Sequence, residues 1–307
     1  MQAKIGHALL SAGRTVPTMT IAIAGASGNL GRKTADLLLE RIDPSELVLV
    51  TRTPDRLAAY ADRGVTVREG DFDSPASLPA AFASVDRLLL ISASDIGRRI
   101  PQHLAAVHGA RAAGVSHIIY TSIANPAESN PVAVAVEHRA TEEGIKASGL
   151  AWTFLRDGIY AEVEVGAILG ALGSGQLVHN RGDGASAFVA RDDVAAVAAV
   201  VLTTEGHAFQ AYDVTGPALL TGDDLAAIAT QVTGTPVTAI AVDDATFVSG
   251  LVRHAGMPES LAAAVATFGQ AIREGHQDQL TDVVERLTGR PATPLADVLK
   301  ASVAVAA

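Results

Sequence analysis

The segment Met19-Thr-Ile-Ala-Ile-Ala-Gly-Ala-Ser-Gly-Asn-Leu-Gly31 decides the fold of this chain. A short apolar run leads directly into three glycines, and a helical pattern with leucines on one face follows. A dinucleotide pyrophosphate rests on a helix N-terminus in this strand–turn–helix order. We expect Gly25 to permit the tight turn, Gly28 to let the backbone approach the phosphates, and Gly31 to allow close helix packing. A structural turn also collects glycine, so the flanking strand and helix carry the prediction.

Arg52 indicates which dinucleotide is bound. The next predicted strand, 47–50, ends in Thr51-Arg52-Thr53, and Arg56 follows one turn later. NAD-selective sites usually place a carboxylate here, about 20 residues after the glycines, to bind the ribose hydroxyls. A guanidinium instead suits a 2′-phosphate. The sequence therefore predicts NADP(H) in preference to NAD(H), and a solvated arginine at a strand end is the alternative.

Composition excludes several classes of protein. With 307 residues, 49% of them hydrophobic, the chain can bury a core as one large domain or as a domain with a lobe. The net charge of −10, with scattered basic residues, argues against a nucleic-acid partner. Zero cysteines exclude disulfides, thiolate metal sites and a cysteine nucleophile. No apolar run approaches the roughly 18 residues that span a bilayer. We therefore expect a cytoplasmic protein with no metal site and no membrane insertion.

Residues 1–18 are set apart from the fold by their composition. They carry Lys4, His7 and Arg14 but no acidic residue, and their apolar stretch is too short for a secretory signal. The first strand begins directly after Met19. We therefore expect an N-terminal extension, with an amphipathic targeting segment as the alternative.

The remaining pattern predicts an α/β fold with a Rossmann-type doubly wound parallel sheet. Residues 19–155 alternate between strand-like and helix-like stretches, which predicts βαβ units and a dinucleotide-binding domain. Residues 156–307 are expected to form a small, mostly helical C-terminal lobe with segments returning to the same globular unit. The predicted strands are 20–24, 47–51, 65–68, 87–92, 116–121, 151–155, 211–214 and 236–241. The predicted helices are 28–41, 54–62, 75–83, 100–113, 132–148, 192–203, 221–233, 243–256, 258–273 and 278–288.

The usual proton donor of short-chain reductases is absent. These enzymes use a Tyr-x-x-x-Lys pair on one helix, but none of the tyrosines at 60, 120, 160 and 212 has a lysine four residues later. The predicted helix 132–148 instead offers His138 and Glu142 on one face, where the carboxylate could orient or charge the imidazole. A histidine of near-neutral pKa could deliver a proton. An ordinary charged surface helix is the alternative.

From Met19 onward the chain resembles the NmrA-like, atypical short-chain reductases, and among them the bacterial NAD(P)H:quinone oxidoreductase type 2 group. The matching segments are Ala24-Gly-Ala-Ser-Gly-Asn-Leu-Gly31, Val50-Thr-Arg-Thr-Pro54, Leu88-Leu-Leu-Ile-Ser-Ala-Ser94 with Gly97, Ala112-Ala-Gly-Val115, Ile119-Tyr-Thr-Ser122, Glu137-His138, Ser148-Gly149, and Thr153-Phe-Leu-Arg-Asp-Gly158 with Tyr160. Several of these segments are specific to the family.

The resemblance implies a role for each matching position. The implied cofactor contacts are Gly25, Ala26, Ser27, Gly28, Asn29 and Leu30 at the pyrophosphate, Arg52 at the 2′-phosphate, Asp71 at the adenine, Ser92, Ala93 and Ser94 beside the nicotinamide ribose, and Thr121 and Ser122 beneath the nicotinamide. His138 and Tyr160 are the catalytic candidates. Tyr160 would line the substrate pocket with an aromatic face, and a packed core tyrosine is the alternative.

The resemblance implies NADPH-dependent hydride transfer to a quinone or a similar conjugated carbonyl. The family often has Asn-Gly after the strand-end arginine, whereas this chain has Asp157, which favours a ketone or aldehyde reductase of the same fold as one alternative. An NADP(H)-sensing regulatory protein without turnover is the other. The expected partner is a small-molecule substrate, and a homo-oligomer stays open.

Overall fold

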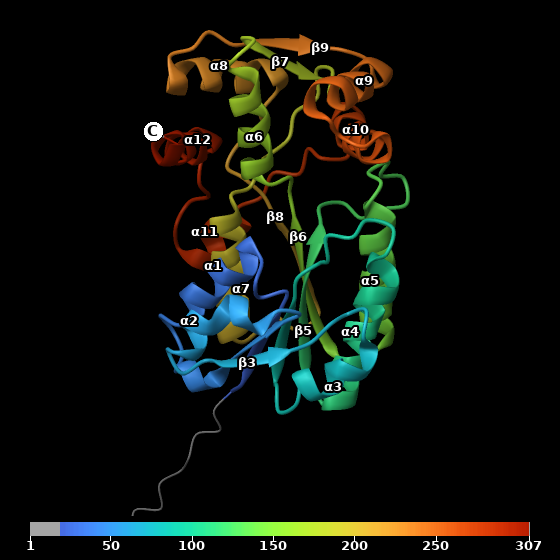
Figure 1. Cartoon of the computed structure of the whole chain (residues 1–307), viewed down its shortest axis with the longest axis vertical. Helices are drawn as coiled ribbons and strands as arrows, with labels where there is room; N and C mark the ends of the chain where they lie inside the picture. Colours follow the sequence, from blue (N-terminus) through green and yellow to red (C-terminus); the bar gives the residue numbers. More distant parts are fainter. Residues whose placement is uncertain (1–18, 307) are drawn as a thin grey trace, which may run out of the picture.

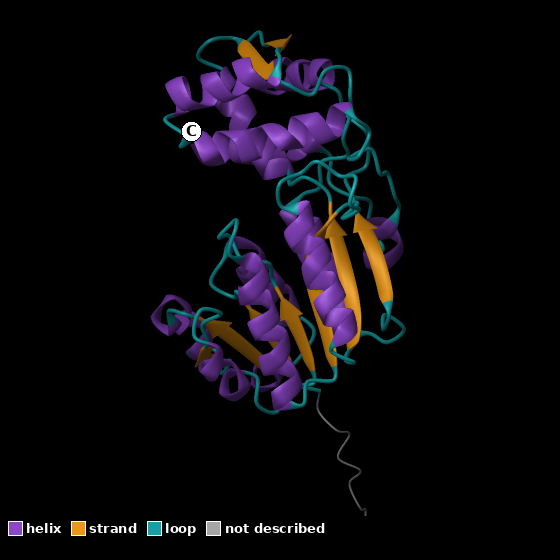
Figure 2. Ribbon diagram, turned by 90° about the vertical axis from the view of Figure 1, so that its right-hand side faces the viewer, coloured by secondary structure: helices purple, strands orange, loops and turns teal. Residues whose placement is uncertain are grey.

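A computed structural model describes residues 19–306 and contains the predicted parallel sheet (Figures 1 and 2). Its seven strands follow the order β3-β2-β1-β4-β5-β6-β8, and every neighbouring pair is parallel. The strands are β1 (Ile21–Ala24), β2 (Leu47–Thr51), β3 (Thr66–Glu69), β4 (Arg87–Leu90), β5 (His117–Ile123), β6 (Ala151–Asp157) and β8 (Gln210–Val214). The predicted fold class is therefore confirmed.

Apolar strands lie at the centre of the sheet because helices cover both of its faces. β1, β2, β4 and β5 are buried along their whole length, whereas the edge strand β3 is partly exposed. Their valine, isoleucine and leucine runs are typical of strands buried on both faces. The predicted extension, residues 1–18, lies outside the described part of the chain.

Each face of the sheet has its own layer of helices, as Figure 1 shows. On one side lie α1 (Asn29–Leu38), α2 (Ala58–Ala61), α7 (Arg191–Thr203) and α11 (Val283–Thr288), which share one apolar core. On the other side lie α3 (Leu78–Ala81), α4 (Arg99–Ala113) and α5 (Ala135–Ala147), which share a second core. Short 3₁₀ turns, Pro44–Glu46, Pro54–Leu57 and Pro75–Ser77, precede β2, α2 and α3.

A smaller, mostly helical group of elements sits beyond the carboxyl ends of the strands, at the top of Figure 1. It contains α6 (Ala161–Ala171), β7 (Gln176–His179), α8 (Gly222–Thr233), β9 (Thr238–Ala241), α9 (Asp244–Ala255), α10 (Glu259–Arg273) and α12 (Leu295–Ala306). β7 and β9 form a separate parallel pair. The sequence reading missed α6, β7 and α12. Within residues 19–306, no helix has the length and apolar character needed to cross a membrane.

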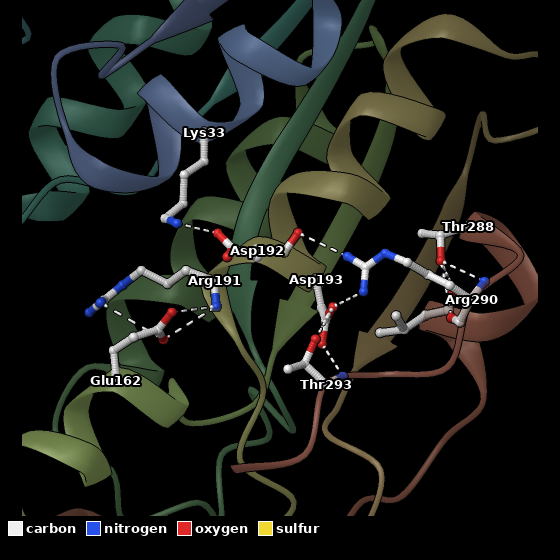
Figure 3. A network of polar contacts seen from close by, with 9 residues as sticks. Lys33, Glu162, Arg191, Asp192, Asp193, Thr288, Arg290 and Thr293 are labelled. Carbon is white, nitrogen blue, oxygen red and sulfur yellow. Dashed lines mark hydrogen bonds and ion pairs between the residues drawn. The ribbon is translucent and has the colours of Figure 1, made fainter. Parts of the chain in front are cut away.

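Charged side chains hold the C-terminal segment against the start of α7, and a further ion pair links α7 to α1 (Figure 3). Asp193, in the first turn of α7, is fully buried. It accepts hydrogen bonds from Arg290 Nη1 at 2.6 Å and from the backbone N–H of Thr293 at 2.6 Å. Lys33 of α1 pairs with the neighbouring Asp192. Because a buried carboxylate needs such partners, Asp193 fixes the path of the chain between α11 and α12.

Candidate functional site

The first feature of the site is a cavity of about 270 Å³ at the carboxyl ends of β1, β2 and β4. The chain runs outward from β1 to β2 and β3, and then returns to β4 on the other side. Open parallel sheets bind ligands at such a switch in strand order. The cavity is lined by Gly25, Ser27, Gly28, Val50, Thr51, Arg52, Gly70, Asp71, Phe72, Ile91, Ser92, Ala93, Ser94, Asp95 and Gln102.

The glycine turn between β1 and α1 forms one wall of this cavity. Gly25 has a φ of +86°, a backbone conformation that favours glycine, and its N–H donates to the Val50 carbonyl at 3.2 Å. A Cβ on Gly31 would lie 2.7 Å from both the Gly25 carbonyl oxygen and Ala26 Cα. Gly28 is the N-cap of α1 and makes no side-chain cap hydrogen bond. The tight turn expected at Gly25 is confirmed. Gly31 allows a close approach as well, but α1 there approaches the turn residues Gly25 and Ala26 rather than the strand, which the sequence had led us to expect.

Arg52 lies at the end of β2, exposed and lining the same cavity. Beneath it, Thr51 Oγ1 donates to Ser27 Oγ at 3.0 Å, which links the strand end to the glycine turn. On the loop after the adjacent strand β3, the Asp71 carboxylate accepts the Asp73 N–H at 3.0 Å in a tight local turn. Arg52 is therefore the cation that the lining presents beside the glycine turn, and Asp71 is an acid on the neighbouring loop.

Five of the predicted cofactor contacts do not line the cavity. Ala26 and Leu30 are buried under the turn, and Asn29 is exposed at the start of α1. Thr121 and Ser122 are buried within β5, which continues to Ile123. The Thr121 hydroxyl accepts the Ser92 N–H, and the Ser122 hydroxyl donates to Glu142.

The loop after β4 forms the opposite wall, and buried side chains hold three of its backbone N–H groups. Ser92 N donates to Thr121 Oγ1, Ala93 N to His103 Nε2, and Gly97 N to Glu137 Oε1, each at 2.9 Å. Gln102, which lines the cavity, and the buried His103 are functional candidates that the sequence pattern did not predict. A signal was present in Pro101-Gln102-His103, where two polar residues stand at the start of an otherwise alanine-rich helix.

His138 lies behind this loop. Its ring is buried, with Nδ1 at 2.8 Å from Tyr120 Oη and Nε2 at 3.3 Å from Arg99 Nη1. Burial, together with the nearby Arg99 charge, lowers the pKa of His138 to about 3. The ring is neutral near pH 7 and carries no readily released proton.

The predicted pair of His138 and Glu142 does not form. Both residues are on the buried face of α5, but Glu142 turns toward β6. It accepts hydrogen bonds from Arg156 Nη2 at 2.7 Å, Arg156 Nε at 3.0 Å and Ser122 Oγ at 2.8 Å. The expectation that Glu142 orients or charges His138 was therefore wrong, because a nearby guanidinium binds the carboxylate.

Tyr160, which is partly buried, forms a hydrogen-bonded pair with the buried Asp157 near the end of β6. Its hydroxyl donates to Asp157 Oδ2 at 2.8 Å, and the Arg191 guanidinium lies 4.9 Å from the centre of its ring. Asp157 is 4% exposed, and its other oxygen has no hydrogen-bond partner among residues 19–306. Burial raises the pKa of Asp157 well above its usual range. Tyr160 is not part of the cavity lining.

Comparison with known proteins agrees with this arrangement. A family model described as NAD(P)H-binding matches residues 25–205. Quinone oxidoreductase 2 of Escherichia coli (strain K12) is 36% identical over 277 residues, which cover 90% of this chain and 96% of that protein. The NAD(P)H azoreductase of Xenophilus azovorans is 30% identical over 286 residues, covering 92% of this chain and 98% of the relative.

A solved structure extends the similarity to three dimensions. The crystal structure of the NADPH-dependent quinone oxidoreductase from Escherichia coli, complexed with NADPH, superposes with a TM-score of 0.89 at 35% sequence identity. The superposition covers 92% of this chain and all of the other. The sheet order and the lobe beyond it are thus shared with a protein that binds NADPH.

Proposed function

The chain belongs to the NAD(P)H-binding, NmrA-like family and is an NAD(P)H-dependent oxidoreductase, and from that premise we propose that it reduces quinones or similar flat, conjugated carbonyl compounds with NADPH. The observation that carries the proposal is the cavity at the switch in strand order, with a glycine turn on one side and Arg52 at its mouth. Similarity over the whole globular chain to a quinone oxidoreductase supports the choice of acceptor.

The residues of the cavity fit the proposed cofactor. Gly25 and Gly28 would lie against the pyrophosphate, since α1 begins beside them with no side-chain cap on its first amides. Arg52 would bind the 2′-phosphate, Asp71 would lie on the adenine side, and the loop at Ser92 would border the nicotinamide ribose. NADPH supplies a hydride, which with one proton converts a quinone to a hydroquinone. The protein's contribution is orientation and exclusion of water.

Neither catalytic candidate lines the cavity, and of the two we propose Tyr160 as the group that aids the reaction. The Tyr160 hydroxyl donates a hydrogen bond to Asp157, and burial raises the pKa of that carboxyl, so it binds a proton more readily than an exposed aspartate. His138 is held neutral between Tyr120 and Arg99. A quinone is an intrinsically good hydride acceptor and does not need a strong acid. We therefore propose that Tyr160 only assists, by helping to orient the substrate and to supply its proton.

The acceptor is tested by an NADPH-oxidation screen over quinones, azo compounds, enones and simple ketones, run beside an NADPH-binding titration. We expect turnover with quinones at the highest kcat/KM. Turnover of ketones alone would indicate the carbonyl reductase that Asp157 favours. NADPH binding without turnover of any acceptor would indicate a regulatory sensor, and either result would overturn the proposal.

Arg52→Asp tests the cofactor preference. A charge-assisted bond to a phosphate contributes about 1.5 to 3 kcal/mol, so we expect the NADPH-to-NADH ratio of kcat/KM to fall about 10- to 100-fold. Arg56→Asp, one turn further on and outside the cavity lining, is the matched control. An unchanged ratio in the Arg52 variant would reject the assignment.

A further inference from the structure

The loop of residues 91–97 is a wall of the cavity with little regular structure of its own. Residues 91–95 all line the cavity, and the loop lies between β4 and α4. Its backbone is instead held by Thr121 of β5, His103 of α4 and Glu137 of α5, each of which accepts one loop N–H. The position of this wall therefore depends on three side chains from three different elements.

His103 can hold the loop in only one of its neutral forms. Its Nε2 accepts the Ala93 N–H at 2.9 Å, so that nitrogen carries no hydrogen. The hydrogen must then be on Nδ1, which donates to Thr141 Oγ1 at 2.9 Å, while Tyr120 Oη lies further from the same nitrogen, at 3.4 Å. The Thr141 hydroxyl in turn donates a hydrogen bond to the Glu137 backbone carbonyl at 2.8 Å. The donors and acceptors of this chain run in a single direction, from the loop to the backbone of α5.

The surroundings keep His103 in the neutral state. The ring is fully buried, and burial together with the Arg99 charge lowers its pKa to about 3. Tyr120 packs edge-on against it with ring centres 5.5 Å apart. Tyr120 also contacts His138, which is neutral because burial, together with the Arg99 guanidinium that its Nε2 faces, lowers its pKa. A protonated His103 would present a hydrogen to the Ala93 N–H and break the contact.

We propose that His103 is a positioning residue, which fixes the cofactor-facing loop at Ala93 through a tautomer that Thr141 selects. The proposal rests on the assignment of this loop to the NADPH site. His103 does not line the cavity, so its effect reaches the cofactor through the backbone of Ala93.

Two amide substitutions separate the two nitrogens of the ring. In His103→Gln the side-chain oxygen can reach the place of Nε2 and accept the Ala93 N–H. In His103→Asn the amide reaches only the place of Nδ1, so the Thr141 contact survives while the loop contact is lost. We expect the NADPH dissociation constant to rise about tenfold in the Asn variant, which leaves a buried N–H unpaired, and about twofold in the Gln variant.

Thr141→Val tests the selection of the tautomer without touching the loop. The variant removes the nearer acceptor of Nδ1–H and leaves only Tyr120 Oη, at 3.4 Å, so the preference for this tautomer weakens and the ring hydrogen can move to Nε2, where it would face the Ala93 N–H. We expect the NADPH dissociation constant to rise about fivefold. Nitrogen-15 NMR of the wild-type protein should show His103 Nε2 as an unprotonated and Nδ1 as a protonated imidazole nitrogen. The Val variant should show both forms.

His117 is a matched control, because it is a buried histidine at the start of β5, whereas Thr121, which binds the loop, lies near the end of that strand. It is also buried, and its Nε2 lies 2.9 Å from Thr153 Oγ1, far from the loop. His117→Asn should lower stability while leaving the NADPH dissociation constant within about twofold of wild type. Equal affinities of the His103 Asn and Gln variants, or protonated Nε2 in the wild type, would overturn the proposal. If the Arg52→Asp variant also binds NADPH as wild type does, the assigned cofactor site fails instead.

Discussion

The two walls of the cavity are built in different ways. The glycine turn between β1 and α1 depends on the absence of side chains, since a Cβ at Gly31 would lie 2.7 Å from backbone atoms of Gly25 and Ala26. The loop after β4 depends on side chains that are distant in the sequence, because acceptors on β5, α4 and α5 bind three of its backbone N–H groups. One wall depends on close backbone packing, and the other depends on buried polar groups.

This difference predicts how each wall fails. Close backbone packing has no tolerance for an added atom, whereas a hydrogen-bonded loop tolerates added volume and fails when an acceptor is removed or protonated. Substitutions that add atoms should therefore damage the turn, and substitutions or pH changes that remove acceptors should damage the loop.

The largest effect is expected for Gly31→Ala. The new methyl group would lie 2.7 Å from Ala26 Cα and the Gly25 carbonyl oxygen, and backbone atoms cannot move aside without opening the turn. We expect a loss of about 3 kcal/mol in the free energy of unfolding, measured in urea, and NADPH binding too weak to titrate.

The control for this change is Gly166→Ala. Gly166 is exposed within α6, and a Cβ there meets nothing within 4 Å. The same substitution should stabilise the protein by about 0.5 to 1 kcal/mol, the usual preference of a helix for alanine. Wild-type stability and NADPH binding in the Gly31 variant would show that packing does not define the turn.

A smaller effect is expected for Thr121→Val, which acts on the other wall. Valine fills the same volume but cannot accept the Ser92 N–H, which donates to the threonine hydroxyl at 2.9 Å. Leaving that N–H unpaired should cost about 2 kcal/mol in urea unfolding and weaken NADPH binding. Thr121→Ser keeps the hydroxyl and should retain the NADPH affinity of wild type. If the Val variant also retains it, the loop does not depend on this acceptor.

Acidification should lower the free energy of unfolding through two buried histidines behind the loop. The pKa values of His103 and His138 are lowered to about 3 in the folded protein, whereas an unfolded histidine titrates near 6.5. As the pH falls below 6.5, the two histidines become protonated in the unfolded chain but stay neutral in the folded protein. The free energy of unfolding therefore decreases progressively down to about pH 3. Between pH 7.5 and 5.5 each ring should account for a loss of about 1.4 kcal/mol.

His103→Gln measures this contribution directly. Urea unfolding of the variant at pH 7.5 and 5.5 should show a pH-dependent loss that is smaller than the wild-type loss by about 1.4 kcal/mol, since the amide does not titrate. The comparison is a difference between two proteins, so the other titrating groups cancel. An identical pH dependence in both proteins would mean that the His103 ring takes up protons as readily in the folded state as in the unfolded chain, so that burial does not lower its pKa.

The same contrast explains what the sequence could predict. The strands, the sheet and the Gly25–Gly31 turn follow from local patterns, because the turn is one continuous segment and its glycines are visible in order. The anchors of the loop are 29, 10 and 40 residues away from the groups they bind, so spacing along one helix could not reveal them. That spacing placed His138 beside Glu142, whereas in the folded chain Arg156 binds the carboxylate.

The smallest effect is expected at Gly97, a glycine in the loop after β4. Its φ is +89°, yet a Cβ there would meet nothing within 4 Å, the reverse of the situation at Gly31. Gly97→Ala should therefore cost about 1 kcal/mol in urea unfolding, from backbone conformation alone. Gly97→Asn should cost less, although asparagine is larger, because asparagine adopts positive φ more readily. A greater loss for Asn than for Ala would mean that side-chain volume limits this position too, and the two walls would then be built alike.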